Sequence, residues 1–389
     1  MNVLLVSNGF GEAAIAASIA RAIATKAPAA TVEHAPLVGR FDGPIWPPVV
    51  GPRLDMPSGG LITYGNVKNL LRDLRSGLVT LSISQFRFLS RQRRRDAVVA
   101  VGDVYCLAVC LLFVRRPTMF VATAKSEYVA RHSRLECAVA RRGGATFARD
   151  AATAAALARR GVPARFAGNA MMDELDQTEC RLPAPSGAPA IGILPGSRRD
   201  AVQNAARAVR RLRRIAALLP SAGPLQAFIA AAPTVDISDL MRALCAEGIA
   251  PSATGARRGV VARSHGGPIH ISIVAGCLGD VLRASTIVLG QAGTGNEQAA
   301  GAGRPVVAAL EGRERQSRMG WYRMRQQRLL GEALLVLPAD DAQFASGVVA
   351  LLNDQGRMEA MGRVGRMRMG AAGASAAVAQ AVLALETRE

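Results

Sequence analysis

Two glycine-bearing turns, far apart in the sequence, carry residue types that bind anions. Residues 194–198 are Leu-Pro-Gly-Ser-Arg, and residues 291–298 are Gln-Ala-Gly-Thr-Gly-Asn-Glu-Gln. Each turn follows a short apolar run that predicts a buried strand, and each precedes a segment that predicts a helix. The first amides of a helix have no partner within it, and the helix dipole favours negative charge there. Each turn is therefore a candidate phosphate site.

The side chains of the two turns extend this chemistry. The hydroxyls of Ser197 and Thr294 add hydrogen-bond donors, and Arg198 adds a planar guanidinium group. Glu297 follows Thr294 by almost one helical turn, where a carboxylate suits a ribose diol better than a phosphate. Phosphate and ribose together indicate a nucleotide. The alternative for either turn alone is an ordinary connection between a strand and a helix.

The composition favours a globular protein with anionic partners. Of its 389 residues, 50% are hydrophobic and 20% are charged, and the net charge is +19. All but three of the 48 basic residues are arginine, which together with abundant alanine also fits a genome rich in G and C. Positive charge favours phospholipid headgroups, phosphorylated sugars or nucleic acid. Because only 4% of residues are aromatic and no DNA- or RNA-binding motif is present, we expect no nucleic-acid partner.

Cysteine and histidine give no indication of a metal site. The six cysteines form no CxxC pair, and the four histidines lack the spacing of metal ligands. We therefore expect a cytoplasmic protein in a reducing compartment, without a metal or another cofactor. The N-terminal residues enter a predicted strand directly, so we expect no signal peptide.

Residues 97–114 are apolar except for Gly102 and Asp103. This stretch would barely cross a bilayer, and Asp103 would lie inside it. A strand over 96–101, a turn at Gly102 and Asp103, and a buried helix over 105–113 explain more of the pattern. A membrane-spanning helix is the alternative.

Strand and helix patterns alternate along the chain. In the first half, strands are predicted at 3–6, 31–35, 96–101, 119–122, 145–148 and 164–167, and helices include 127–141 and 150–160. In the second half, strands are predicted at 190–194, 225–229, 270–274, 286–290, 305–310 and 334–337, with a helix near 316–330 and two closing helices. This alternation predicts an α/β protein whose parallel sheets are covered on both faces.

A proline-rich stretch at 181–189 has the composition of an interdomain linker. We therefore predict two doubly wound, Rossmann-like domains that face a cleft. The first covers 1–180, and the second, which contains both glycine turns, covers 190–365. Residues 366–389 form a closing helix that returns to the first domain.

Together these motifs resemble the GT-B glycosyltransferases, and more narrowly the lipid-A-disaccharide synthase family and its relatives. The resemblance rests on the Leu-Pro-Gly-Ser-Arg turn, on Ala292-Gly293-Thr294 with Glu297, and on Gly-Arg-Pro-Val-Val at 303–307. Residues 166–173 resemble the segment that closes the family's first domain, and residues 7–12 resemble its N-terminal glycine loop less closely. That loop lacks the family's Ser-Gly-Asp run, a departure that bears on the acceptor and the sugar more than on the fold.

The resemblance implies an inverting glycosyltransferase that moves a sugar from a nucleotide-diphosphate sugar, most simply a UDP-sugar, to a lipid or glycolipid acceptor. It implies that the diphosphate lies on backbone amides without a metal and that an arginine stabilises the leaving charge. The implied nucleotide-sugar-binding residues are Gly196, Ser197, Arg198, Gly293, Thr294, Glu297 and Gln298. In the first domain, which is expected to face the membrane and bind the acceptor, the residues of the N-terminal loop are Asn8, Gly9 and Gly11. The candidate acceptor contacts are Lys125 and Asn169, and the alternative for Asn169 is to cap a turn.

Asp103 and Glu12 are the candidate catalytic residues. Asp103 ends a predicted strand within an apolar stretch, an environment that raises the pKa of a carboxyl group toward that of a general base. Its alternative role is to cap the following helix. Glu12 is expected at the first helical position after the glycine loop, where it binds the sugar, acts as the base or balances the helix dipole. His265 and His270 are either donor contacts or loop residues without a function.

A lipid acceptor also explains residues 61–95, where leucine and phenylalanine are interleaved with arginine. Such a segment fits an anionic interface and predicts peripheral contact with the inner face of the cytoplasmic membrane. Two ordinary surface helices are the alternative. For the whole chain, the rival functions are a UDP-sugar 2-epimerase, which shares the fold, and a non-catalytic relative that binds a sugar nucleotide or a lipid.

Overall fold

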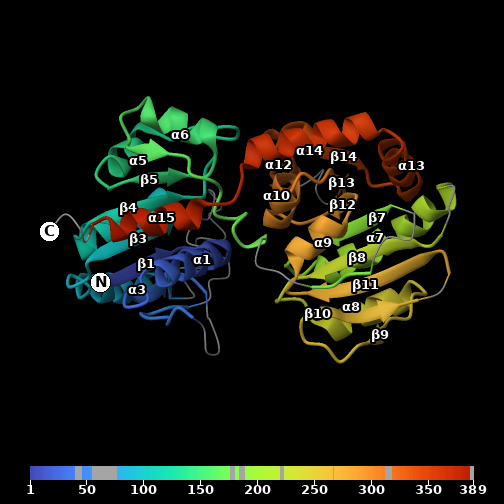
Figure 1. Ribbon diagram of the computed structural model, residues 1–389, viewed down its shortest axis with the longest axis horizontal. Coiled ribbons are helices and arrows are strands. Elements are labelled where there is room, and N and C mark those ends of the chain that lie inside the picture. Colours follow the sequence, from blue (N-terminus) through green and yellow to red (C-terminus); the bar gives the residue numbers. More distant parts are fainter. Residues whose placement is uncertain are drawn as a thin grey trace. The chain divides into compact units, whose positions relative to one another are not determined.

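The computed structural model describes residues 1–39, 46–54, 77–175, 180–183, 189–219, 223–265, 267–311 and 318–385. Three expected segments lie partly outside the described residues: the arginine-rich segment (61–76), the linker (184–188) and the helix near 316–330 (316–317). The chain divides into two compact units, shown in Figure 1. Unit 1 comprises Met1–Asp173 and Ala372–Glu389, and unit 2 comprises Glu174–Ala371.

Unit 1 is built on a six-stranded sheet in which every neighbouring pair of strands is parallel. The strand order is β2-β1-β3-β4-β5-β6. The strands are β1 (Asn2–Ser7), β2 (Thr31–Pro36), β3 (Ala97–Gly102), β4 (Thr118–Ala122), β5 (Thr146–Ala148) and β6 (Ala164–Arg165). All six residues of β3 are buried, as expected for a central parallel strand covered on both faces.

Helices pack on this sheet. They are α1 (Phe10–Lys26), α3 (Leu78–Ser90), α4 (Val104–Val109), α5 (Arg134–Ala140), α6 (Ala151–Ala158) and α15 (Ala374–Leu383), with a π-helical turn, η1, at Cys110–Val114. Helix α15, red in Figure 1, comes from the end of the chain and packs with α1. Val378 and Val382 of α15 share one core cluster with Ile15 and Ile19 of α1.

Unit 2 is built on an eight-stranded sheet with the order β14-β13-β12-β7-β8-β11-β10-β9. Its strands are β7 (Ala190–Leu194), β8 (Leu225–Ala231), β9 (Ser252–Ala253), β10 (Gly259–Ser264), β11 (Ile269–Ala275), β12 (Ile287–Gly290), β13 (Val306–Leu310) and β14 (Leu334–Pro338). Its helices are α7 (Ala201–Leu218), α8 (Ile237–Ala246), α9 (Leu278–Ala284), α10 (Thr294–Gly301), α12 (Arg318–Leu330), α13 (Asp341–Leu352) and α14 (Gln355–Met369), with a 3₁₀ turn at Gly331–Ala333.

The α/β class is confirmed, but the expectation of purely parallel sheets is wrong at one edge of unit 2. Strand β10 runs antiparallel to both β11 and β9. Strands β9 and β10 and helix α8 lie in a region where the sequence pattern predicted no element, whereas β11 was predicted at 270–274. Strand β10 includes Arg263 and Ser264 and so lacks the continuous apolar run that marks the central parallel strands.

Two other expected elements differ in length or type. Helix α5 is shorter than expected because Ser133 caps it, accepting a hydrogen bond from Glu136 N at 3.2 Å while Glu136 accepts one from Ser133 N at 2.6 Å. Residues 97–114 form β3, α4 and η1, so the membrane-spanning alternative is wrong for this segment. Within the described ranges, no helix is both long enough and apolar enough to cross a bilayer.

Candidate functional site

The structure brings the two glycine turns together at the carboxyl ends of two neighbouring strands of the sheet in unit 2. Strand β12 pairs in parallel with β7, and Gly290 lies opposite Leu194. Gln291 N donates a hydrogen bond to the Leu194 carbonyl at 2.9 Å. A Cβ atom placed on Gly196, whose φ is +100°, would lie 3.6 Å from the Gln291 carbonyl oxygen. The two turns therefore line neighbouring strand ends, as one composite anion site requires.

The second turn leads directly into a helix. Helix α10 begins at Thr294, with Gly293 as its N-cap and no side chain capping it. Thr294 is exposed, Glu297 is half-buried and Gln298 is buried. The exposed side of this turn thus combines helix N-terminal amides, a hydroxyl and a carboxylate.

The first turn differs from the prediction, because its helix starts late. Helix α7 begins only at Ala201, so the amides of Gly196 and Ser197 precede the helix rather than form its first turn. The loop is held from the protein side: Asn204 Nδ2 donates to the Pro195 carbonyl at 3.0 Å, and Thr234 Oγ1 donates to the Ser197 carbonyl at 2.7 Å. Ser197 and Arg198 are exposed. This turn offers loop amides and an exposed guanidinium group without a helix dipole behind them.

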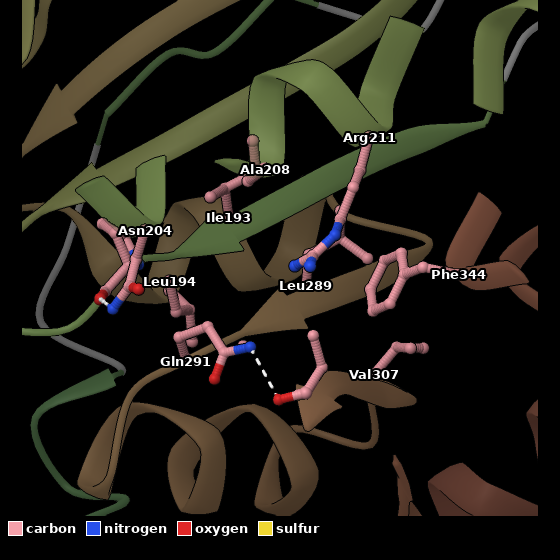
Figure 2. A pocket seen from close by; sticks show the side chains of 12 residues that line it. Ile193, Leu194, Asn204, Ala208, Arg211, Leu289, Gln291, Val307 and Phe344 are labelled. Atoms are coloured by element: carbon pink, nitrogen blue, oxygen red, sulfur yellow. Dashed lines mark hydrogen bonds between the residues drawn. The ribbon is translucent and has the colours of Figure 1, made fainter. Parts of the chain in front are cut away.

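A pocket beneath the two turns contains a buried arginine that the sequence reasoning missed. Figure 2 shows Arg211 of α7 pointing into it beside Phe344, with Gln291 on the opposite wall. The Arg211 guanidinium donates hydrogen bonds to Asp341 Oδ1 at 2.9 Å and to the Ala339 carbonyl at 2.8 Å, and its Nη2 forms an ion pair with Glu311 Oε1 at 3.0 Å. Its Cζ atom lies 4.6 Å from the centre of the Phe344 ring. Arg211 is therefore a structural cation that ties α7 to the strands beside it.

A second buried arginine lies under the second turn. Arg323 of α12 donates from Nη1 to Gln326 Oε1 at 2.7 Å and from Nη2 to Gln291 Oε1 at 2.5 Å. Asn296 Nδ2 donates to the Gly290 carbonyl and to Gln326 Oε1, both at 3.1 Å. Arg323, Gln326 and Asn296 each expose at most 4% of their surface. The sequence offered a weak signal: Gln291 and Asn296 lie within the recognised turn, but the arginine of α12 looked like one more surface charge.

In unit 1, the two candidate catalytic residues lie at the same edge of the sheet. Asn8 and Glu12 follow β1, Asp103 follows β3, and Thr123 follows β4, three neighbouring strands. Thr123 Oγ1 donates to Glu12 Oε1 at 3.4 Å. Asn8 forms a side-chain hydrogen bond with Asp103. Glu12 and Asp103, which are distant in the sequence, therefore belong to one cluster.

Burial governs the protonation of both carboxyl groups. It raises the pKa of Glu12, and the nearby Asp103 charge raises it further, against lowering by hydrogen bonds and Arg149. Burial also raises the pKa of Asp103, against backbone amides at Cys106 and Tyr105 that stabilise its anion. Both groups are thereby shifted toward the pKa of a general base.

Asp103 and Glu12 have different attachments to the backbone. Asp103 is the N-cap of α4, where its Oδ1 accepts from Cys106 N at 3.0 Å, so the capping alternative is confirmed. Glu12 lies at the third position of α1, because that helix already begins at Phe10 and not at Glu12 as expected. Asp103 thus accepts from the first-turn amides of α4, whereas Glu12 accepts from its own backbone amide and from the hydroxyl of Thr123, which follows β4.

Two glycines allow side chains of this cluster to lie close to the backbone. A Cβ atom on Gly9 would collide with Glu12 Oε2, and one on Gly102 would collide with Asn8 Oδ1. Gly11 has no atom within 4 Å of its Cβ position. Gly9 and Gly102 therefore allow the cluster to close, while packing does not require a glycine at position 11.

The other candidate residues lie in different surroundings. Lys125 Nζ pairs with Glu136 Oε1 at 2.6 Å, and buried Asn169 accepts from Met171 N at 3.1 Å, which is the turn-capping alternative. His265 and His270 form an edge-to-face pair at 5.3 Å, but His270 lies near the start of β11. The parallel strands of unit 2 place the glycine turns at the opposite edge, so a donor contact by this histidine pair is not supported.

The structure pairs two cysteines that the sequence pattern did not connect. Cys180 and Cys277 form a disulfide with a Cα–Cα distance of 6.2 Å. A carboxylate oxygen of Asp280 lies within 4.8 Å of both sulfurs, but Asp280 accepts from Cys180 N at 2.9 Å and pairs with Arg283 at 2.5 Å. This cluster therefore fastens the segment that leaves unit 1 to the start of α9.

Comparison with known proteins identifies the fold. No protein-family model matches the chain, and no curated protein matches its sequence. A putative UDP-N-acetylglucosamine 2-epimerase from Listeria monocytogenes matches in structure with a TM-score of 0.59 and 13% identity, over 99% of this chain and 96% of that one. The S. aureus MnaA–UDP co-structure has a TM-score of 0.56 and 12% identity, over 99% and 98% of the two chains.

A glycosyltransferase matches equally well. The calicheamicin glycosyltransferase CalG4 has a TM-score of 0.56 and 15% identity, over 100% of this chain and 98% of that one. The chain therefore has the GT-B fold that these enzymes share. The GT-B part of the sequence resemblance is confirmed, and the narrower likeness to lipid-A-disaccharide synthase stays a prediction.

Proposed function

We propose that the protein is a GT-B enzyme that uses a nucleotide-diphosphate sugar, most simply a UDP-sugar, and that it acts as an inverting glycosyltransferase. One observation carries the proposal: two glycine turns from distant parts of the sequence meet at neighbouring strand ends, where Gly290 lies opposite Leu194. The same fold occurs in a structure solved with UDP and in one bound to UDP-GlcNAc.

Unit 2 supplies the donor site in this proposal. The diphosphate binds the amides of Gly293 and Thr294 at the start of α10, with those of Gly196 and Ser197 beside them. Exposed Arg198 stabilises the charge that grows on the departing diphosphate, and Glu297 accepts hydrogen bonds from the ribose. Buried Gln298 supports this first turn of the helix.

Unit 1 supplies the base. An acceptor hydroxyl forms a bond to the anomeric carbon while the bond to the diphosphate breaks, and its proton passes to a carboxylate. We assign this role to Glu12, because the Asp103 carboxylate is already held by backbone amides as the cap of α4. Asp103 then acts as the fixed neighbouring charge that makes Glu12 more basic.

The acceptor is proposed to be a lipid or glycolipid at an anionic membrane surface. The described part of the arginine-rich segment is α3, which exposes Val79 and Ile83, and the adjoining α4–η1 exposes Tyr105 and Leu112. Phe86 of α3 stacks on Phe113 of η1 with ring centroids 4.4 Å apart. Exposed arginines follow α3 at Arg91, Arg93 and Arg94. Apolar residues with flanking arginines fit peripheral binding to the inner face of the cytoplasmic membrane.

A 2-epimerase is the second candidate, because several solved structures that match the whole chain are UDP-GlcNAc 2-epimerases. Such an enzyme needs further acid–base groups around the sugar. His34 of β2 is buried, forms a hydrogen bond with Ser7 Oγ at 2.8 Å, and burial lowers its pKa to about 4. A neutral, enclosed imidazole favours the transferase.

Two measurements test the proposal. Calorimetry with UDP, with and without magnesium, should show magnesium-independent binding that Glu297→Ala weakens by about 10- to 100-fold, since a charge-assisted hydrogen-bonding pair is lost. Absence of UDP binding would remove the nucleotide proposal. Incubation with UDP-GlcNAc alone then separates the candidates: an epimeric sugar product supports the isomerase, and sugar transfer only after addition of a lipid acceptor supports the transferase.

A further inference from the structure

The orientation of one buried side chain under the second glycine turn is determined by its neighbours. Gln326 Oε1 accepts hydrogen bonds from Arg323 Nη1 at 2.7 Å and from Asn296 Nδ2 at 3.1 Å. Arginine only donates, so the atom that faces it must be the amide oxygen. The Nε2 group of Gln326 must therefore point the other way, and it donates to the carbonyls of Ala292 at 3.2 Å and Gly293 at 3.1 Å.

These two bonds hold two successive peptide groups. A peptide group is planar and trans, so its N–H points away from its C=O. With the Ala292 and Gly293 carbonyls directed toward buried Gln326, the amides of Gly293 and Thr294 are directed away from the core. Gly293 is half-buried and Thr294 is exposed, so these amides point toward the accessible side of the turn.

We propose that Gln326, oriented by Arg323 and Asn296, is the positioning residue that aims the amides of Gly293 and Thr294 at a bound diphosphate. The inference rests on the proposed function, because it assigns the phosphates of the donor to this turn. Arg323 also holds Gln291 Oε1 at 2.5 Å, and Gln291 Nε2 bonds the Ala309 carbonyl at 3.0 Å (Figure 2), which links the turn to β13. Preorganised donors of this kind bind an anion without reorganising when it arrives.

Gln326→Glu is the sharpest variant. It keeps the shape of the side chain and its acceptor for Arg323, but it replaces the Nε2 donor with an oxygen that repels both carbonyls. The affinity for UDP should fall by about 10- to 100-fold, while the affinity for uridine, which lacks phosphates, should change by less than about threefold. Both affinities are measured by calorimetry in the same buffer.

The control is a matched glutamine in the same unit. Gln226 is also buried, but it lies at the start of β8 and bonds His270 at 3.3 Å, at the edge away from the turns. Gln226→Glu should leave the ratio of UDP to uridine affinity unchanged. Arg323→Lys tests the orienting role: a lysine keeps a donor for Gln326 Oε1 and should retain more UDP affinity than Arg323→Met.

The outcomes separate the two levels of the proposal. If the wild type does not bind UDP, the proposed function fails and the positioning role fails with it. If the wild type binds UDP and Gln326→Glu binds it equally well, the positioning role alone is overturned. If Gln326→Glu does not fold by circular dichroism, the comparison of Arg323→Lys with Arg323→Met decides, and equal ratios of UDP to uridine affinity would overturn the inference.

Discussion

The carboxyl ends of the strands in both sheets lead through turns into helices, but the turns carry acidic side chains in unit 1 and exposed backbone amides in unit 2. In unit 1, the strand ends lead to partly buried carboxyl groups, Glu12 and Asp103, whose pKa values burial raises. In unit 2, they lead to glycine turns that present backbone amides, with Arg211 and Arg323 buried beneath them. The strand–turn–helix unit itself therefore does not determine whether an edge accepts protons or binds anions. The first few residues after each strand, and the side chains behind them, make that difference.

The largest effect is expected from replacing Glu12, the proposed general base of unit 1. Glu12→Gln should lower the turnover number by about 100- to 10,000-fold, the usual contribution of a general base. The affinity for UDP should stay unchanged, because the proposed donor site lies in unit 2. Steady-state kinetics and calorimetry on the same preparation check both parts.

Asp103→Asn is the matched comparison for that prediction. Its amide oxygen still accepts the Cys106 amide and caps α4, so its effect on turnover should be smaller than that of Glu12→Gln. A greater loss in Asp103→Asn would reverse the roles assigned to the two carboxyl groups. A loss of UDP affinity in either variant would contradict the division of labour between the units.

A smaller effect should come from glycines at the two edges. Gly102 and Gly196 both have positive φ, +141° and +100°, where a side chain is strained. At Gly102 an added Cβ also collides with Asn8 Oδ1, whereas at Gly196 the nearest atom is 3.6 Å away. Gly196→Ala should therefore cost about 1–3 kcal/mol of unfolding free energy from strain alone, and Gly102→Ala should cost more.

Urea unfolding followed by circular dichroism measures the two glycine variants. Gly11→Ala serves as the control, because it lies within α1, has no atom near its Cβ position and replaces a poor helix former. It should be neutral or slightly stabilising. Equal costs for Gly102→Ala and Gly196→Ala would show that the edge of unit 1 relaxes around an added methyl group.

The sequence predicted the parts of the fold that local periodicity encodes. The apolar runs of β3 and β7 and the glycine turns marked strand ends, so the α/β class and the turns of unit 2 followed from local pattern. Strand β10 was missed because an edge strand contains polar residues such as Arg263. The late start of α7 was missed because residues 197–200 are compatible with a helix until loop contacts such as Thr234 to Ser197 hold them.

The site shows the same division between local and long-range information. Glu12 and Asp103 were recognised singly from their places after predicted strands, but their meeting depends on the order of strands in the sheet. Nothing in the sequence indicated that Gln326 and Arg323 are buried, because a buried arginine cannot be distinguished from a surface arginine by residue type alone. Only the packing of α12 against the turn distinguishes Arg323 from exposed Arg328 on the same helix.

The smallest expected effect is in the pH dependence of stability, which tests whether the pKa of Glu12 is raised in the folded protein. Burial raises the pKa of Glu12, so the folded state keeps this proton to a higher pH than the unfolded chain. Below the ordinary glutamate range both states are protonated, and the stabilising contribution is fully present. As the pH rises through the raised pKa of the folded state, that contribution is lost and the unfolding free energy falls.

Glu12→Gln removes this titration, so its unfolding free energy relative to the wild type should rise from acid to neutral pH and then level off. Urea unfolding at a series of pH values measures this difference, with Glu359→Gln, a substitution of an exposed side chain of α14, as the control for the loss of one carboxyl group. If the difference between Glu12→Gln and the wild type does not depend on pH, Glu12 has the same pKa in the folded and unfolded chain. That result would contradict the proposal that burial raises the pKa of the base.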